Sequence, residues 1–178
     1  MVSRRTLILT TPVFFLAPRL AVAEVSPERM AERLIAEAVN AGRARMAPDL
    51  PPLAGEAVLD AIARERSAAM AAGAPFDHQD ADGGYPAIQK MRTRYAQYGA
   101  MGENIAMDFE PSRNQFDPRY YATRMVDEWF KSEAHRENIL SPAFTRCGTG
   151  VARSPGRTTV YATQVFWGPP VFRRSQRG

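Results

Sequence analysis

The chain of 178 residues is 45% hydrophobic and has a formal net charge of +4. This length supplies one domain with a substantial core and is too short for two domains of ordinary size. The charge does not indicate a nucleic-acid-binding protein, because residues 1–23 hold three arginines and no acid, which leaves 20 of the 23 basic residues against all 19 acidic ones. We therefore expect one domain, a monomer, with no nucleic-acid partner.

Residues 1–23 have the pattern of an export signal. Arg4 and Arg5 precede the apolar segment 6–17, which is too short to cross a bilayer, and Ala21-Val22-Ala23 has the small residues of a cleavage site. The arginine pair suits the twin-arginine route, and an ordinary secretory signal is the alternative. We expect a periplasmic or secreted protein whose domain spans residues 24–168.

Two helices are predicted in the first half of that domain. Ser26 can cap a helix that has Pro27 at its first position, and apolar residues then recur three and four positions apart until Pro48. A second apolar stripe predicts a helix over residues 56–72, ended by Gly73. Each helix has one buried face, so both are expected to cover a core.

The next segment is a loop followed by two more helices. Residues 76–84 are rich in turn-forming residues, and their weak likeness to a calcium loop lacks the later ligands. Helical patterns run from Pro86 to Gly99 and from about Arg119 to Trp129, separated by a loop over 110–118. Ser132 is placed to end the last helix and cap the next turn.

Two strands are predicted near the C-terminus, over residues 147–152 and 158–167, joined as a hairpin. The second strand is apolar on both faces, which is typical of a central strand covered on both sides. The pattern predicts an α+β fold, a three-layer α-β-α sandwich with a small antiparallel sheet. Cys147, the only cysteine, is expected to be a small buried hydrophobe, and residues 169–178 form a basic tail.

The chain has only two histidines, His78 and His135, so imidazole chemistry or metal binding must use one or both. Glu103 stands in a short apolar stretch, where it can serve a site or pair with Arg136 or another arginine. Nearby amides, Asn104 and Asn138, are expected to hydrogen-bond buried backbone. Helical spacing places Trp129 in the core.

Five short motifs follow one another along the chain: Phe76-x-His78, Gly102-Glu103-Asn104-Ile105-Ala106, Trp129-x-x-Ser132-x-x-His135-Arg136-x-Asn138-Ile139-Leu140, Gly148-x-Gly150-Val151 and Tyr161-x-x-Gln164-Val165-Phe166. Together they resemble the bacterial branch of the CAP superfamily, the SCP-like extracellular proteins. That superfamily includes cysteine-rich secretory proteins, insect antigen 5 and plant pathogenesis-related proteins of class 1. The resemblance covers about residues 31–167.

The resemblance implies an α-β-α sandwich with a central cleft, and it implies that His78, Glu103 and His135 meet at the base of this cleft. These are three of the four positions of the family's tetrad of two histidines and two acids. The fourth acid of the eukaryotic pattern corresponds here to Ser132, beside Glu133. Bacterial relatives commonly have this serine, so a four-ligand site is not expected.

Two neutral imidazoles and one carboxylate suit zinc with an open position for water. The candidate metal ligands are therefore His78, Glu103 and His135, and the same trio could instead form a buried hydrogen-bonded network. Our leading hypothesis is an exported, non-catalytic CAP-domain protein whose cleft binds a divalent metal, a small apolar molecule or a lipid. The alternatives are a metal-dependent hydrolase of peptides or envelope polymers and an envelope scaffold without a ligand.

Overall fold

The computed structural model describes residues 25–95, 99–109, 116–156 and 159–170. Outside these ranges lie the predicted export signal, Tyr98, most of the 110–118 loop and most of the basic tail. The elements, in chain order, are α1 (Pro27–Met46), β1 (Ala54–Gly55), α2 (Ala57–Ala71), α3 (Pro86–Arg94), β2 (Ala100–Phe109), α4 (Pro118–Lys131), α5 (Glu133–Leu140), β3 (Arg146–Arg153) and β4 (Thr159–Gly168).

The sheet has the strand order β1-β3-β4-β2. The predicted hairpin is confirmed, since β3 and β4 pair antiparallel, and β4 is central because β2 pairs antiparallel on its other side. Its two faces are both buried, with Val160 and Phe166 on one and Val165 on the other. The two-residue β1 pairs parallel with β3, so the small sheet is mixed at one edge.

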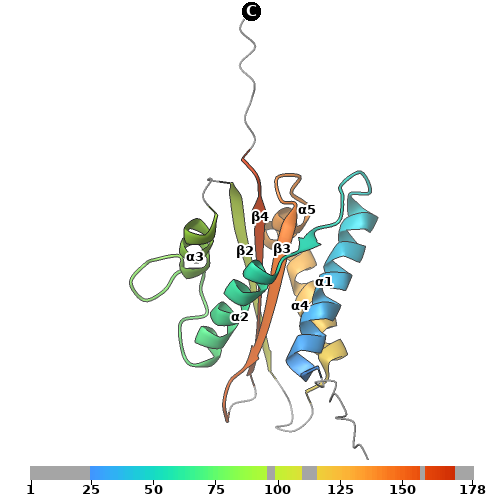
Figure 1. The fold of residues 1–178 in the computed structure, drawn as a ribbon. Coiled ribbons are helices and arrows are strands. Elements are labelled where there is room, and N and C mark those ends of the chain that lie inside the picture. Colours follow the sequence, from blue (N-terminus) through green and yellow to red (C-terminus); the bar gives the residue numbers. More distant parts are fainter. Residues whose placement is uncertain (1–24, 96–98, 110–115, 157–158, 171–178) are drawn as a thin grey trace, which may run out of the picture.

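Helices cover both faces of this sheet, which confirms the three-layer α-β-α prediction (Figure 1). The layer of α1, α4 and α5 buries Ile35, Val39 and Trp129 against one face, and none of the three is exposed. On the other face, α2 and α3 bury Leu59 and Met91 in a smaller apolar cluster. The chain therefore has a core on each side of one sheet.

The helix ends follow the local signals in the sequence. The hydroxyl oxygen of Ser26 accepts a hydrogen bond from the backbone N–H of Arg29, so the predicted cap of α1 is confirmed. Gly73 follows α2 with a φ of 113°, a conformation that glycine adopts without strain. The third helix ends at Arg94, earlier than the predicted Gly99.

Two glycines let α2 lie directly on the backbone of β3. A Cβ atom added to Gly148 would lie 2.1 Å from the backbone carbonyl carbon of Leu59. One added to Gly150 would lie 2.2 Å from the backbone nitrogen of Arg64. Neither distance is compatible with a side chain, so the Gly-x-Gly pattern sets how closely α2 approaches the sheet.

Buried Arg43 ties the end of α1 to three other segments. Its side chain donates hydrogen bonds to the backbone carbonyl oxygens of Pro51 (2.8 Å), Ile139 (2.5 Å), Ser141 (3.1 Å) and Phe144 (3.4 Å). These acceptors belong to the segment before β1, the end of α5 and the turn before β3. Arg43 therefore holds in place the short helix that carries His135.

Candidate functional site

The centre of the candidate site is a hydrogen bond between His78 and Glu103. His78 lies in the loop between α2 and α3, and Glu103 lies on β2. The Nδ1 atom of His78 is 2.8 Å from Oε2 of Glu103. Because an ionised carboxylate only accepts hydrogen bonds, Nδ1 carries the proton and Nε2 is left for another partner. This hydrogen bond raises the pKa of His78 above its usual 6.5.

Arg66 of α2 lies behind the Glu103 carboxylate. Its Nε is 3.6 Å from Oε1 of Glu103, and both side chains are almost fully buried. The same guanidinium donates to the backbone carbonyl of Asp77, next to His78. The expected pairing of Glu103 with an arginine is thus observed, but the partner is Arg66. The guanidinium of Arg136 bonds instead to the backbone carbonyl of Phe130, at 2.8 Å.

The second histidine reaches the same place from α5. The ring centre of His135 lies 6.3 Å from that of His78, with the two planes inclined by 61°. Burial, followed by the proximity of His78, lowers the pKa of His135 below its usual 6.5. At neutral pH His135 is therefore an uncharged imidazole, the form that can act as a metal ligand or a hydrogen-bond acceptor.

Two amides fix α5 against β2. The side-chain nitrogen of Asn104 donates to the backbone carbonyl of His135 at 3.0 Å. That of Asn138 donates to Oδ1 of Asn104 at 2.8 Å and to the backbone carbonyl of Glu103 at 3.3 Å. The prediction that both amides serve buried backbone is confirmed. Trp129 is also in the core as predicted, and its Nε1 donates to the carbonyl of Ile105.

Ser132 marks the junction between α4 and α5, where the sequence places it. It is the residue after α4 and the residue before α5. Its side chain, however, makes no capping hydrogen bond, so the predicted capping role holds for its position and not for its hydroxyl. Glu133 follows in the first turn of α5, where a carboxylate is favourable near the positive end of the helix dipole.

The donor set allows a test of how well the residues fit zinc. Within the described ranges, no group of three or more His, Cys, Asp or Glu side chains is arranged to hold a metal ion. The Glu103 carboxylate is already bonded to Nδ1 of His78. Two imidazoles on one tetrahedral zinc have ring centres about 5 Å apart, and the 6.3 Å observed here is wider. The two rings would have to approach by about 1 Å to share one zinc ion, and Glu103 would then be an outer partner that orients His78.

A cavity of about 440 Å³ opens beside His78 and Glu103, and His135 is not among its lining residues. His78 and Glu103 line it together with Asp77, Gln79, Tyr85 and Ile88. The sequence patterns indicate no role in the site for Arg66 or for these additional lining residues. For Arg66 a signal exists, since it follows Leu59 and Ile62 at helical spacing on the buried face of α2. For Tyr85 and Ile88 we find none.

The described residues contain no helix long and apolar enough to cross a membrane. The sequence model of the cysteine-rich secretory protein family, CAP, matches residues 36–166. The chain is also 35% identical, over 123 residues, to YkwD of Bacillus subtilis strain 168, an uncharacterized protein. That alignment covers 69% of this chain and 43% of YkwD, so the chain spans less than half the length of this relative.

Two solved structures have the same fold. An extracellular protein of Bacillus anthracis that contains an SCP domain aligns with a TM-score of 0.59 and 26% identity, over 82% of this chain and 45% of that protein. An outer surface protein of Borrelia burgdorferi aligns with a TM-score of 0.64 and 15% identity, over 79% of this chain and 93% of that protein. With the family match spanning His78, Glu103 and His135, this chain belongs to the cysteine-rich secretory protein (CAP) family.

Proposed function

We propose that this CAP-family chain works outside the cytoplasm as a binding protein, and that its two histidines bind a divalent metal ion such as zinc. The export pattern of residues 1–23 supports the location. So does the relative from Bacillus anthracis, which is described as extracellular. The single observation that carries the metal proposal is the geometry of His78, which is oriented by Glu103 and faces His135.

Two properties of the pair favour a metal ligand role. The Glu103 carboxylate holds the His78 ring so that Nε2 points away from the hydrogen bond. A carboxylate on the outer nitrogen of a histidine is the usual second partner in zinc sites, where it fixes the ring orientation. His135 is neutral at pH 7, because its pKa is lowered, and needs to lose no proton before it binds.

Binding is favoured over hydrolysis by the surroundings of Glu103. Its Oε2 accepts from His78, and its Oε1 faces the Arg66 guanidinium. Neither oxygen is positioned to take a proton from a bound water, which a general base must do. Ser132 replaces the second acid of the tetrad, and a serine hydroxyl does not supply that base.

A bound zinc ion would supply a fixed positive charge and Lewis acidity beside His78, which lines the cavity. The residues of this chain would then select what enters. The cavity of about 440 Å³ has both a polar side, with Gln79 and Asp77, and an apolar side, with Ile88 and Tyr85. That size and mixture suit a small amphipathic molecule, so a small apolar molecule or a lipid chain remains part of the proposal.

Zinc titration calorimetry on the metal-free chain at pH 7.5 tests the proposal. We expect a dissociation constant in the micromolar range, about 8 kcal/mol. The His78→Ala/His135→Ala double variant should not bind, and Glu103→Gln should bind about 10- to 100-fold more weakly, as for an outer-shell partner. Gln79→Ala, which changes a lining residue that is not a proposed metal ligand or a partner of one, is the matched control.

Circular dichroism in EDTA distinguishes metal binding from a purely structural role of His78, Glu103 and His135. If the double variant remains folded with unchanged thermal stability and fails to bind zinc, the histidines serve binding. If the wild-type chain, folded and metal-free, gives no heat with zinc, the metal proposal is wrong. A large loss of stability in the double variant without zinc would then identify the trio as a structural network.

A further inference from the structure

A second groove lies at the opposite edge of the sheet from Glu103. The two residues of β1 pair only with Arg146 and Cys147 of β3. Beyond them, the outer edge of β3 has no neighbouring strand among the described residues and faces a groove of about 760 Å³ between α1 and α2. Because β2 and β3 lie on opposite sides of β4, this groove is separate from the site at His78.

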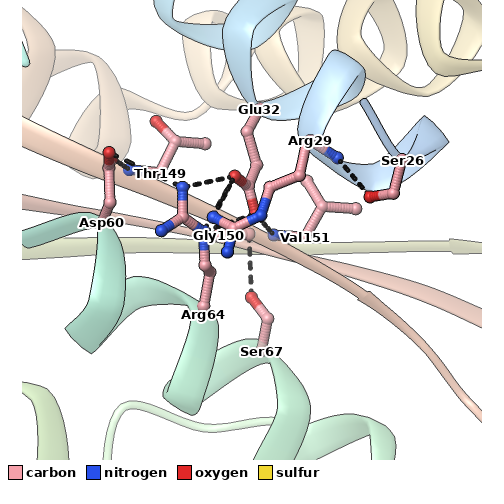
Figure 2. Close-up of polar contacts among 9 residues, drawn as sticks. All are labelled: Ser26, Arg29, Glu32, Asp60, Arg64, Ser67, Thr149, Gly150 and Val151. Atoms are coloured by element: carbon pink, nitrogen blue, oxygen red, sulfur yellow. Dashed lines mark hydrogen bonds and ion pairs between the residues drawn. The ribbon is translucent and has the colours of Figure 1, made fainter. Parts of the chain in front are cut away.

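Along this groove, backbone N–H groups at the outer edge of β3 donate hydrogen bonds to side chains and not to a neighbouring strand. Oδ1 of Asp60 accepts from the backbone N–H of Thr149 at 3.0 Å, and Oε1 of Glu32 accepts from that of Val151 at 3.3 Å. Figure 2 shows these carboxylates reaching the strand from α2 and α1. With both edge donors occupied, the groove is not a slot for an added β-strand, and a small ligand is its natural occupant.

The charges in the groove leave one arginine without a partner. Glu32 is 6% exposed, and its Oε2 lies 2.8 Å from Nη2 of Arg64 and 3.1 Å from Nη1 of Arg29 (Figure 2). Arg64 also lies 3.6 Å from Asp60. Three arginines and two carboxylates line the groove in all. Within the described part of the chain, Arg33 alone among these five makes no ion pair or hydrogen bond. The groove therefore has an available cation at its rim.

The floor of the groove has an unsatisfied polar group. Thr149 lines the groove and is 2% exposed, and its hydroxyl has no hydrogen-bond partner among the described residues. Gln164, its cross-strand neighbour on β4, is fully buried, and its side chain is a hydrogen-bond partner of the Cys147 thiol. Buried polar groups are nearly always satisfied in folded proteins, so the Thr149 hydroxyl is a group that a polar ligand atom at the floor would satisfy.

We propose that this groove binds a small organic carboxylate that has a compact apolar body and a second polar oxygen. The carboxylate pairs with Arg33 at the rim, because a guanidinium is the preferred partner of that group. The second oxygen hydrogen-bonds to the Thr149 hydroxyl at the floor. Between them, Leu53 and Ala36 provide apolar wall that contacts the body of the ligand.

Three related probes test the proposed contacts with Arg33 and with Thr149 one at a time. The probe 4-hydroxybenzoate carries both groups at opposite ends of an apolar ring, benzoate lacks the hydroxyl, and phenol lacks the carboxylate. In titrations of the whole chain followed by ¹H–¹⁵N NMR, we expect 4-hydroxybenzoate to bind more tightly than either analogue, with shifts at residues of α1 and β3. Each missing contact should weaken binding about tenfold, a typical effect of one hydrogen bond or charge-assisted contact.

Two variants and one control complete the test. Thr149→Val keeps the shape of the side chain and should abolish the preference for 4-hydroxybenzoate over benzoate. Arg33→Gln should abolish the preference for 4-hydroxybenzoate over phenol. The His78→Ala/His135→Ala variant should bind all three as the wild type does, which separates this groove from the histidine site. If 4-hydroxybenzoate at tens of millimolar shifts no groove residue, or if Thr149→Val and Arg33→Gln bind like the wild type, the proposal is wrong and the polar atoms of the floor bind water.

Discussion

The Nδ1 atom of His78 and the Oε2 atom of Glu103, from a loop and from an edge strand, lie 2.8 Å apart. This contact determines the charge of the site. It keeps a proton on His78, while His135, 6.3 Å away, is pushed toward its neutral form. The two imidazoles of the site therefore differ in their protonation, although their rings are neighbours.

The first prediction concerns the protonation of the two histidines. In the metal-free chain, NMR titration of the ring protons should give a pKa above 6.5 for His78 and one below 6.5 for His135. Glu103→Gln should lower the pKa of His78, because the hydrogen bond to the carboxylate is the main cause of its elevation. Gln79→Ala should leave both values unchanged. Equal pKa values for the two rings would contradict the observed geometry.

The second prediction is the pH dependence of stability. The raised pKa of His78 contributes stability that is present below pH 6.5 and is lost as the pH rises through its folded value. The lowered pKa of His135 has the opposite effect. It destabilises the folded state at low pH, and this destabilisation disappears as the pH rises toward 6.5. The free energy of unfolding of the wild type, relative to His78→Ala/His135→Ala, should therefore be largest near pH 6.5.

Urea unfolding in EDTA across pH 5 to 8 measures this difference. Subtracting the double variant removes the contribution of Glu32, whose pKa burial raises to about 7. A difference that rises or falls steadily across the whole range would show that only one of the two histidines is perturbed as described.

The third prediction concerns the contact between α2 and β3. Gly150→Ala places a Cβ 2.2 Å from the backbone of Arg64, where only backbone movement can relieve the overlap. We expect a loss of about 3 kcal/mol in the free energy of unfolding, at the upper end of overpacking costs. Gly55→Ala is the control, because its added Cβ meets nothing within 4 Å. Chemical denaturation of both variants compares them, and equal stabilities would show that α2 does not lie as close as described.

The fourth prediction concerns the buried arginine of α1. Arg43→Met removes the donor to four backbone carbonyl oxygens, and a buried acceptor without a partner is costly. We expect destabilisation of about 3 kcal/mol or more, measured by thermal or urea unfolding. Arg45→Met, an exposed position on the same helix, should change stability by less than about 0.5 kcal/mol. Similar effects of the two substitutions would show that the hydrogen bonds of Arg43 do not stabilise the fold as described.

Local patterns were sufficient for most helix boundaries and for the central strand. Ser26 acts through its own side-chain hydroxyl and Gly73 through its own backbone, and the apolar faces of residues 159–168 required cover on both sides. Cys147 is buried as predicted, and burial raises the pKa of its thiol to about 12. By contrast, the sequence pattern of residues 100–109 does not predict the strand β2. Gly102, Glu103 and Asn104 interrupt the apolar alternation there, and pairing with β4 supplies the missing stability.

By itself, the sequence determined the layered fold and the identity of the two histidines, because periodicity, caps and residue counts are properties of short segments. Only the tertiary structure decided which arginine stands behind Glu103. Arg66 and Arg136 are 37 and 33 positions from Glu103, and their distances along the chain do not distinguish them. Arg66 is brought to Glu103 because α2 packs on the face of the sheet to which the Glu103 side chain points. Contacts between distant segments depend on packing, and packing is a property of the whole fold.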